Sequence, residues 1–220
     1  MPNDLNKRVL TSTLLLLLLL FFNFTFFFKL GLILIILLVF LEFRNIFKKI
    51  LIRSKNKNIK FFILNSLAFI YIFVFFGISS IELHDKIGSP ILFLFIILIC
   101  ILSDIGGYIV GKIVGGKKLT KISPNKTISG TIGSFIFSLF SIMIFKIFFD
   151  FNFDIGFSLI LFVFLVSLVS QLGDLFISYL KRMARIKDTG SLLPGHGGFL
   201  DRLDGIIFAI PFSYILIKFI

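Results

Sequence analysis

Hydrophobic residues occur along this chain in long runs of Leu, Ile and Phe, and charged residues gather in clusters between the runs. A run of about 17–25 apolar residues is long enough to cross a bilayer as a helix, and flanking Lys or Arg side chains extend the reach of shorter runs. The pattern predicts about seven membrane-spanning helices, with one more or one fewer allowed. They are expected near residues 11–28, 30–43, 61–80, 90–103, 130–148, 156–173 and 205–220.

Composition strengthens the membrane assignment. Hydrophobic residues make up 58% of the 220 positions, and the mean hydropathy is +1.08. A soluble domain with so much apolar surface would aggregate, so the bilayer must be the main solvent. We therefore expect an all-α, polytopic integral membrane protein. The N-terminal segment has the positive charge and the hydrophobicity of a signal peptide but no small-residue cleavage site. We therefore expect that it is not cleaved and forms the first membrane span.

The distribution of charge predicts which loops face the cytoplasm. The acidic loops are short, and the longer loops are rich in Lys and Arg. The basic loops are residues 44–60, 104–129 and 174–204, and the acidic loops are residues 81–89 and 149–155. With Lys7 and Arg8 inside, seven spans place every basic loop in the cytoplasm. We attribute the net charge of +12 to these loops and to anionic lipid, with no nucleic-acid partner. We expect a multi-pass protein of the cytoplasmic (inner) membrane with its polar site facing the cytoplasm.

Cysteine and histidine are too few for several common cofactor sites. Cys100 stands alone in an apolar run, so the chain has neither a disulfide framework nor a Cys-x-x-Cys metal site. His84 lies in an acidic loop, and His196 lies among Pro and Gly residues. A turn or a headgroup contact is a more ordinary role for His196 than proton transfer. No His/Cys cluster supports zinc, haem or pyridoxal phosphate.

The first polar cluster begins with Asp104, at the end of the predicted fourth span. A carboxylate at that depth is costly, and so it usually has a partner. Gly106, Gly107 and Gly111 follow, with lysines beyond them. The ordinary interpretation is a helix end with a Gly-rich turn and snorkelling lysines. The functional interpretation is a carboxylate that binds a ligand.

The second polar cluster precedes the predicted fifth span. Ser123, Asn125, Lys126 and Thr127 offer hydroxyl, amide and ammonium groups at a helix start. Free backbone N–H groups at such a start can bind phosphate. Ordinary N-capping by Thr127 or Ser129 would use the same residues, and the sequence leaves both interpretations open.

The third polar cluster follows the predicted sixth span. Asp174, Ser178 and Arg182 are spaced i, i+4, i+8 and would form one polar stripe on a helix leading from the membrane to the cytoplasm. A solvated helix face would look similar, but Asp174 follows directly on a hydrophobic span. We expect its partner to be a cation, either a metal or a basic side chain.

Residues 178–204 carry most of the polar chemistry of the chain. Basic residues lead into a Gly-rich turn and then into a closing pair of aspartates, a combination that suits a metal-dependent phosphate site. The marked residues, in order, are Ser178, Lys181, Arg182, Lys187, Asp188, Gly190, Pro194, His196, Gly197, Gly198, Asp201, Arg202 and Asp204. This order resembles the signature of the phosphatidate cytidylyltransferases, the CDP-diacylglycerol synthases.

The resemblance covers residues 104–204, because the clusters at Asp104 and at residues 123–130 also match family features in the same order. Before residue 90 the similarity is mainly one of hydropathy, although Arg8 and Glu42 fit as well. The chain therefore divides into N-terminal membrane helices with a basic loop, residues 1–89, and a catalytic membrane region, residues 90–220. The chain is short for such enzymes, and an N-terminal span or two is expected to be missing.

The resemblance implies transfer of a cytidylyl group from CTP to phosphatidic acid, which gives CDP-diacylglycerol and pyrophosphate for phospholipid biosynthesis. It implies Mg²⁺, with K⁺ as a candidate second cation. The implied metal ligands are Asp174 and Asp201, with Asp204 and Asp104 as weaker candidates, and the implied catalytic residues are Asp174, Asp201, Lys181 and Arg182. The implied substrate contacts are Ser123, Asn125, Lys126, Thr127, Ser178, Lys187, Asp188, His196, Gly197, Gly198 and Arg202. The expected partners are CTP, phosphatidic acid and the lipid bilayer, with a homodimer left open.

Other functions compete with this one. An enzyme that uses CTP on another lipid, such as a polyprenol kinase or an archaeal-lipid cytidylyltransferase, would share the chemistry. A CDP-alcohol phosphotransferase would need an Asp-Gly-x-x-Ala-Arg motif, which the chain lacks. A transporter would spread its binding residues over several spans near the midplane, whereas these concentrate at one edge. An inactive scaffold of the same family would not need the intact aspartates and basic residues.

Overall fold

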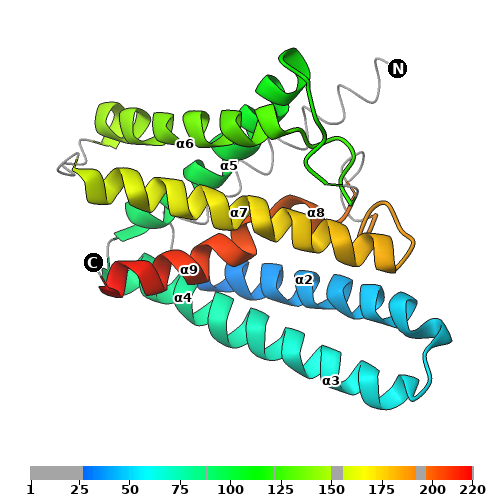
Figure 1. Ribbon diagram of the computed structural model, residues 1–220. Coiled ribbons are helices and arrows are strands. Elements are labelled where there is room, and N and C mark those ends of the chain that lie inside the picture. Colours follow the sequence, from blue (N-terminus) through cyan, green and yellow to red (C-terminus); the bar gives the residue numbers. More distant parts are fainter. Residues whose placement is uncertain (1–26, 88, 121, 150–155, 192–196, 220) are drawn as a thin grey trace. The chain divides into compact units, whose positions relative to one another are not determined.

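The computed structural model describes residues 27–87, 89–120, 122–149, 156–191 and 197–219. Within them the regular structure is helical, and the β pairing is a single isolated bridge between Lys118 and Thr127. Apolar runs form helices because a helix satisfies its own backbone N–H and C=O groups where no water is present. The α-helices, in chain order (Figure 1), are α2 (Phe28–Ile50), α3 (Lys57–Phe69), α4 (Gly77–Glu82), α5 (Ser89–Ile113), α6 (Ile128–Phe149), α7 (Phe157–Met183), α8 (Leu200–Leu203) and α9 (Ile206–Phe219).

Five described helical segments are long and apolar enough to cross a membrane. They are Phe28–Ile50, Lys57–Asp85, Pro90–Ile113, Ile128–Phe149 and Phe157–Met183. The second is continuous because a π-helical segment, Ile70–Phe76, joins α3 to α4. These segments correspond to the second through sixth predicted spans, and they confirm the all-α, polytopic membrane architecture.

The two remaining predicted spans differ in what the structure says of them. The span expected at 205–220 corresponds to α9, which has 14 residues. A helix of that length is about 21 Å long, shorter than the ~30 Å hydrocarbon core. The span expected at 11–28 lies almost wholly outside the described residues. The number of spans therefore stays a prediction.

The fourth span extends further than its hydropathy indicated. Its helix, α5, continues for ten residues beyond the predicted end and finishes at Ile113. Gly106 and Gly107 therefore lie inside a helix, and their interpretation as a turn at a helix end is wrong. The turn comes later, at Gly115 and Gly116, whose φ angles of +62° and +103° favour glycine.

The glycines inside α5 allow it to pack closely against α6. A Cβ added at Gly106 would lie 2.4 Å from the Phe137 Cβ, and a Cβ added at Gly133 would lie 2.4 Å from the Val110 Cβ and 2.8 Å from the Gly106 carbonyl oxygen. Gly107 faces Ser134 and Gly130 in the same way. Small residues commonly bring membrane helices together like this, because dispersion contacts replace the hydrophobic effect there.

Substituting Gly133 with Ala is expected to destabilise the α5–α6 pair by about 1–3 kcal/mol, the usual cost of overpacking. Alanine's better helix propensity cannot compensate, because the new methyl group meets a branched side chain and a backbone carbonyl. Unfolding of the purified protein in mixed detergent would measure the change. Ile132→Ala is the matched control, since Ile132 is the neighbouring, exposed position. Equal stability of Gly133→Ala and the native protein would contradict close packing at this contact.

The chain folds into two compact units that are interleaved in the sequence. The first contains the described residues up to Ile81 together with Leu180–Leu203, and the second contains Glu82–Tyr179 together with Asp204–Ile220. In the first unit, Phe40 of α2 packs edge-on against Phe69 and Phe73, at ring-centroid distances of 5.8 and 5.9 Å. The last residues of α7 and most of the signature segment, Leu180–Leu203, belong to this unit with α2. The functional division at residue 90 stays a prediction.

Candidate active site

The chain leaves α7 through a left-handed residue and enters the signature segment. Arg185 has a φ of 56°, and the Ile186 N–H donates to the Lys181 carbonyl at 3.0 Å. A left-handed residue of this kind commonly terminates a helix, although it is usually Gly or Asn. Because Arg185 is neither Gly nor Asn, the end of α7 could not be predicted from the sequence.

Asp201 is the centre of a hydrogen-bond network in the first unit. Its Oδ2 accepts the backbone N–H of Thr189 at 2.8 Å and that of Gly198 at 2.9 Å. The Thr189 hydroxyl lies 3.0 Å from the same oxygen. Its Oδ1 accepts a 2.8 Å hydrogen bond from the Lys181 ammonium group. This one carboxylate therefore connects α7, α8 and the segment between them.

The Asp201 carboxyl is ionised at neutral pH, because its pKa lies below the ordinary value. Burial by itself would raise the pKa of Asp201, but the Lys181 ammonium and the N–H groups of Gly198 and Thr189 outweigh burial and lower the pKa below its ordinary 3.8. Because the folded-state pKa is depressed, the stability that this pair contributes is present above the ordinary value. That stability is lost only as the pH falls through the lower, folded-state value.

Glu42 of α2 holds the other side of the same segment. Its side chain is 3% exposed. Oε1 accepts the Phe199 N–H at 2.9 Å, and Oε2 accepts the Leu200 N–H at 2.9 Å and the Thr189 hydroxyl at 2.5 Å. Thr189 thus lies between Glu42 and Asp201. In the sequence Glu42 stands out only as fitting the family resemblance, so this role was not predicted. A lone carboxylate at the end of an apolar run was the available signal.

The two glycines of the signature turn are required by contacts within the protein. Gly197 has a φ of +83°, which disfavours other residues. A Cβ at Gly198 would lie 2.2 Å from the Thr189 hydroxyl oxygen and 2.3 Å from Glu42 Oε2. The close approach seen here is therefore to Thr189 and Glu42. The predicted approach of this turn to a nucleotide stays a prediction.

A second polar cluster lies in the second unit, around Asp174 of α7. Lys126 forms an ion pair with Asp174 Oδ2, and the Ser178 hydroxyl donates to Oδ1 at 3.3 Å. Lys126 and Asp174 keep 29% and 23% of their side-chain surface exposed. The cationic partner expected for Asp174 is therefore a basic side chain in this structure, and ligands from solvent can still reach the pair.

The segment before α6 is a turn closed by its own hydroxyl groups. The Thr127 hydroxyl accepts the Gly130 N–H at 3.1 Å, so Thr127 is the N-cap of α6. The Ser129 hydroxyl donates to the Gly115 carbonyl. The Lys126 N–H donates to the Ser123 carbonyl at 3.1 Å, and Asn125 is exposed on this turn. N-capping by Thr127 is confirmed, and the turn directs Lys126 to Asp174.

The other predicted site residues are more exposed or lie elsewhere. Asp104 is exposed on α5, and Asp204 accepts the Gly205 N–H at 2.9 Å just before α9. His196 lies outside the described residues. The remaining exposed candidates are Arg182, Lys187, Asp188 and Arg202.

Comparison with known proteins identifies the family. The model of the cytidylyltransferase family matches residues 3–220. The chain belongs to the cytidylyltransferase family. Proteins named phosphatidate cytidylyltransferase are similar to it: one from Staphylococcus saprophyticus is 40% identical over 71% of this chain and 58% of its own length, and one from Bacillus subtilis is 40% identical over 69% and 56%. A third, from Staphylococcus haemolyticus, is 46% identical over 56% of this chain and 48% of its own length. The chain thus spans about half the length of these relatives.

In this chain of the cytidylyltransferase family, the carboxylates of Asp174 and Asp201 differ in how well they could serve as ligands of a magnesium ion. Mg²⁺ prefers oxygen ligands and is commonly held by one or two carboxylates, with phosphates and water completing its shell. The described residues contain no group of three or more His, Cys, Asp or Glu side chains that could form a metal site. Asp174, partly exposed beside the Ser178 hydroxyl, fits such a role. Asp201 fits less well, because Oδ2 is already surrounded by Thr189 and Gly198 and Oδ1 is paired with the Lys181 ammonium group.

Proposed function

We propose that the protein is a phosphatidate cytidylyltransferase, which converts CTP and phosphatidic acid to CDP-diacylglycerol and pyrophosphate. The observation that carries the proposal is membership of the cytidylyltransferase family along residues 3–220. The names of the relatives supply the lipid. The polytopic helices supply access to a substrate that resides in the bilayer.

The reaction needs charge neutralisation more than it needs a protein nucleophile. A phosphate oxygen of phosphatidic acid attacks the α-phosphorus of CTP, a new P–O bond forms, and the bond to the β-phosphate breaks as pyrophosphate leaves. Two polyanions must approach, so the barrier is chiefly electrostatic. The ammonium groups of Lys126 and Lys181 and the Arg182 guanidinium are proposed to bind these phosphates. Bound Mg²⁺ would neutralise the triphosphate and align its leaving group.

The chain's own carboxylates have two separate proposed roles. Asp174, with Ser178 and Lys126 beside it, is proposed as the main metal-binding carboxylate. Asp201 is proposed to hold Lys181 in place and to offer its remaining oxygen capacity to a cation. The cytoplasmic orientation of both clusters, a K⁺ ion as the second cation and the homodimer remain parts of the proposal that rest on the sequence alone.

The test is a transfer assay with the purified protein in lipid nanodiscs containing phosphatidic acid, with Mg²⁺ and CTP labelled either at the α- or at the γ-phosphate. Label from the α-phosphate is expected in the lipid fraction, and EDTA is expected to abolish it. Label from the γ-phosphate in lipid would identify a kinase instead. The absence of labelled CDP-diacylglycerol above background would contradict the proposal. Replacing K⁺ by Na⁺ in the assay tests whether K⁺ is the second cation.

A further inference from the structure

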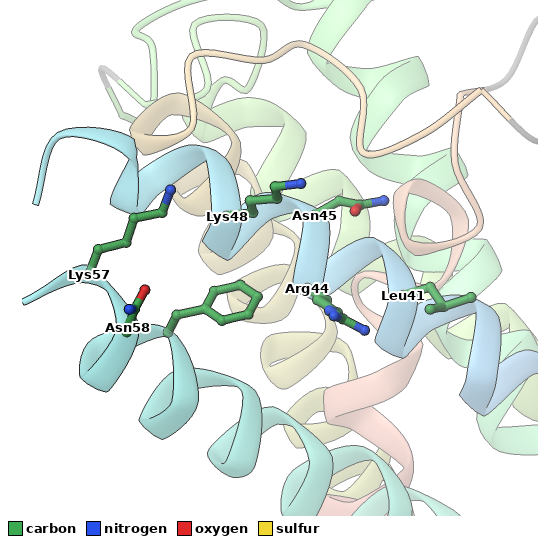
Figure 2. A pocket seen from close by; sticks show the side chains of 7 residues that line it. Leu41, Arg44, Asn45, Lys48, Lys57 and Asn58 are labelled. Atoms are coloured by element: carbon green, nitrogen blue, oxygen red, sulfur yellow. The ribbon is translucent and has the colours of Figure 1, made fainter.

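A basic cavity lies between the ends of α2 and α3, and none of the residues that line it belongs to the clusters around Asp201 and Asp174. Its volume is about 370 Å³, within the range of small-molecule sites. Three cationic side chains line it, Arg44 and Lys48 from α2 and Lys57 from α3. Figure 2 shows Lys57 reaching from α3 towards the helix that carries Lys48.

The cavity lies on the exposed face of α2, and the buried face of that helix includes Glu42. Leu41, Arg44, Asn45 and Lys48 line the cavity and are spaced i, i+3, i+4, i+7, so they share one face of the helix. These four residues are exposed. Glu42 and its buried neighbours on α2 point into the first unit. The cavity is therefore distinct from the Glu42–Asp201 network.

The lining is suited to a phosphate group. It contains no carboxylate, and the Asn45 and Asn58 amides add hydrogen-bond donors to the three cations. Like charges gathered around one cavity repel one another, and a bound anion would relieve that repulsion. The positive-inside rule explains why Lys and Arg are frequent in this loop, but not why three of them share a cavity with two amides.

The cavity also has an apolar side, which favours a lipid over a soluble phosphate. Leu41 and Phe61 line it beside the polar groups, and Leu41 remains 49% exposed. Arg44 and Lys48 lie near the end of one candidate span, and Lys57 begins the next. Lipid headgroups lie at the level of such ends. We propose that this cavity binds the headgroup of an anionic phospholipid, with an acyl chain against Leu41 and Phe61.

The proposal is tested with phosphatidylglycerol, which is anionic but is not the proposed substrate, and with phosphatidylcholine of the same acyl chains. Binding to the purified protein in detergent is measured by native mass spectrometry. The triple variant Arg44→Gln, Lys48→Gln, Lys57→Gln is expected to bind phosphatidylglycerol ~10-fold more weakly or worse. The matched control is Lys49→Gln, Lys55→Gln, Lys60→Gln, which removes the same charge from the same segment but does not line the cavity. It is expected to bind within about twofold of the native protein.

Several outcomes would overturn the proposal. Equal losses in the two triple variants would show that only the overall charge of the loop matters. If phosphatidylcholine bound as tightly as phosphatidylglycerol, the cavity would not recognise an anionic headgroup. If glycerol 3-phosphate bound as tightly as the lipid, the ligand would be a soluble phosphate. The single variant Lys57→Gln, at an exposed position in the first turn of α3, should show a partial loss even if the triple variant proves unstable. Asp174→Asn should leave this binding unchanged, so failure of the transfer assay and failure of this proposal are distinguishable.

Discussion

Replacing Glu42 with Ala is expected to lower cytidylyl transfer by ~100-fold, the loss typical of a small misplacement of reacting groups. The substitution leaves the Phe199 and Leu200 N–H groups without their acceptor. Each buried donor left unsatisfied costs about 1–3 kcal/mol, so the turn that ends at Asp201 should loosen. Glu42→Gln keeps one acceptor oxygen and is expected to lose less activity.

Hydrogen exchange separates this positioning role from a general loss of stability. In Glu42→Ala, peptides covering residues 197–203 should exchange faster, while those of α5 and α6 should not. Leu37→Ala, at an exposed position on the same helix, is the control and should change neither exchange nor transfer. Native exchange at residues 197–203 in Glu42→Ala would show that the carboxylate does not hold the turn.

Asp174→Asn and Asp201→Asn are each expected to lower transfer at least ~100-fold, but for different reasons. Asp174→Asn removes the charge that pairs with Lys126 and that is proposed to bind Mg²⁺, so it should also raise the Mg²⁺ concentration needed for half-maximal rate. Asp201→Asn places an amide N–H₂ group among the donors from Lys181, Thr189 and Gly198. It should therefore accelerate exchange in the 197–203 turn, which Asp174→Asn should not.

Ser213→Ala serves as the control for both aspartate variants, since Ser213 is buried in α9 and its hydroxyl donates to the Ala209 carbonyl of the same helix. It should retain native rates and native Mg²⁺ dependence. Turnover at the native level in either aspartate variant removes that residue from the site. An unchanged Mg²⁺ requirement in Asp174→Asn, with lowered activity, would instead assign Asp174 to the orientation of Lys126.

Hydropathy predicted the spans well because membrane helices are selected by local composition. Their ends were predicted poorly, because the hydropathy of α5 falls at Asp104 and Gly106 although its helix continues. The glycines of that continuation pack against the next helix, α6. Local composition cannot reveal such a contact.

The sequence predicted which residue types form the candidate site, but it did not predict most of the contacts between their side chains. Asp174 followed by Ser178 on one helix face was readable from spacing, and the structure has that contact. Two pairings join distant segments: that of Lys126 with Asp174, and that of Glu42 with Thr189, Phe199 and Leu200. Thr189 carried no sequence signal at all, because a threonine in a loop is ordinary until two carboxylates are seen beside it.

The ion pair between Lys126 and Asp174 couples phosphate binding at Lys126 to cation binding at Asp174. An arriving phosphate that takes the Lys126 ammonium leaves the Asp174 carboxylate with uncompensated charge, and that carboxylate then attracts a cation more strongly. By thermodynamic linkage, a cation at Asp174 must raise the affinity of Lys126 for phosphate by the same factor. The nucleotide affinity measured without metal, and the metal affinity measured without nucleotide, would then each be lower than the affinity measured with the other ligand bound.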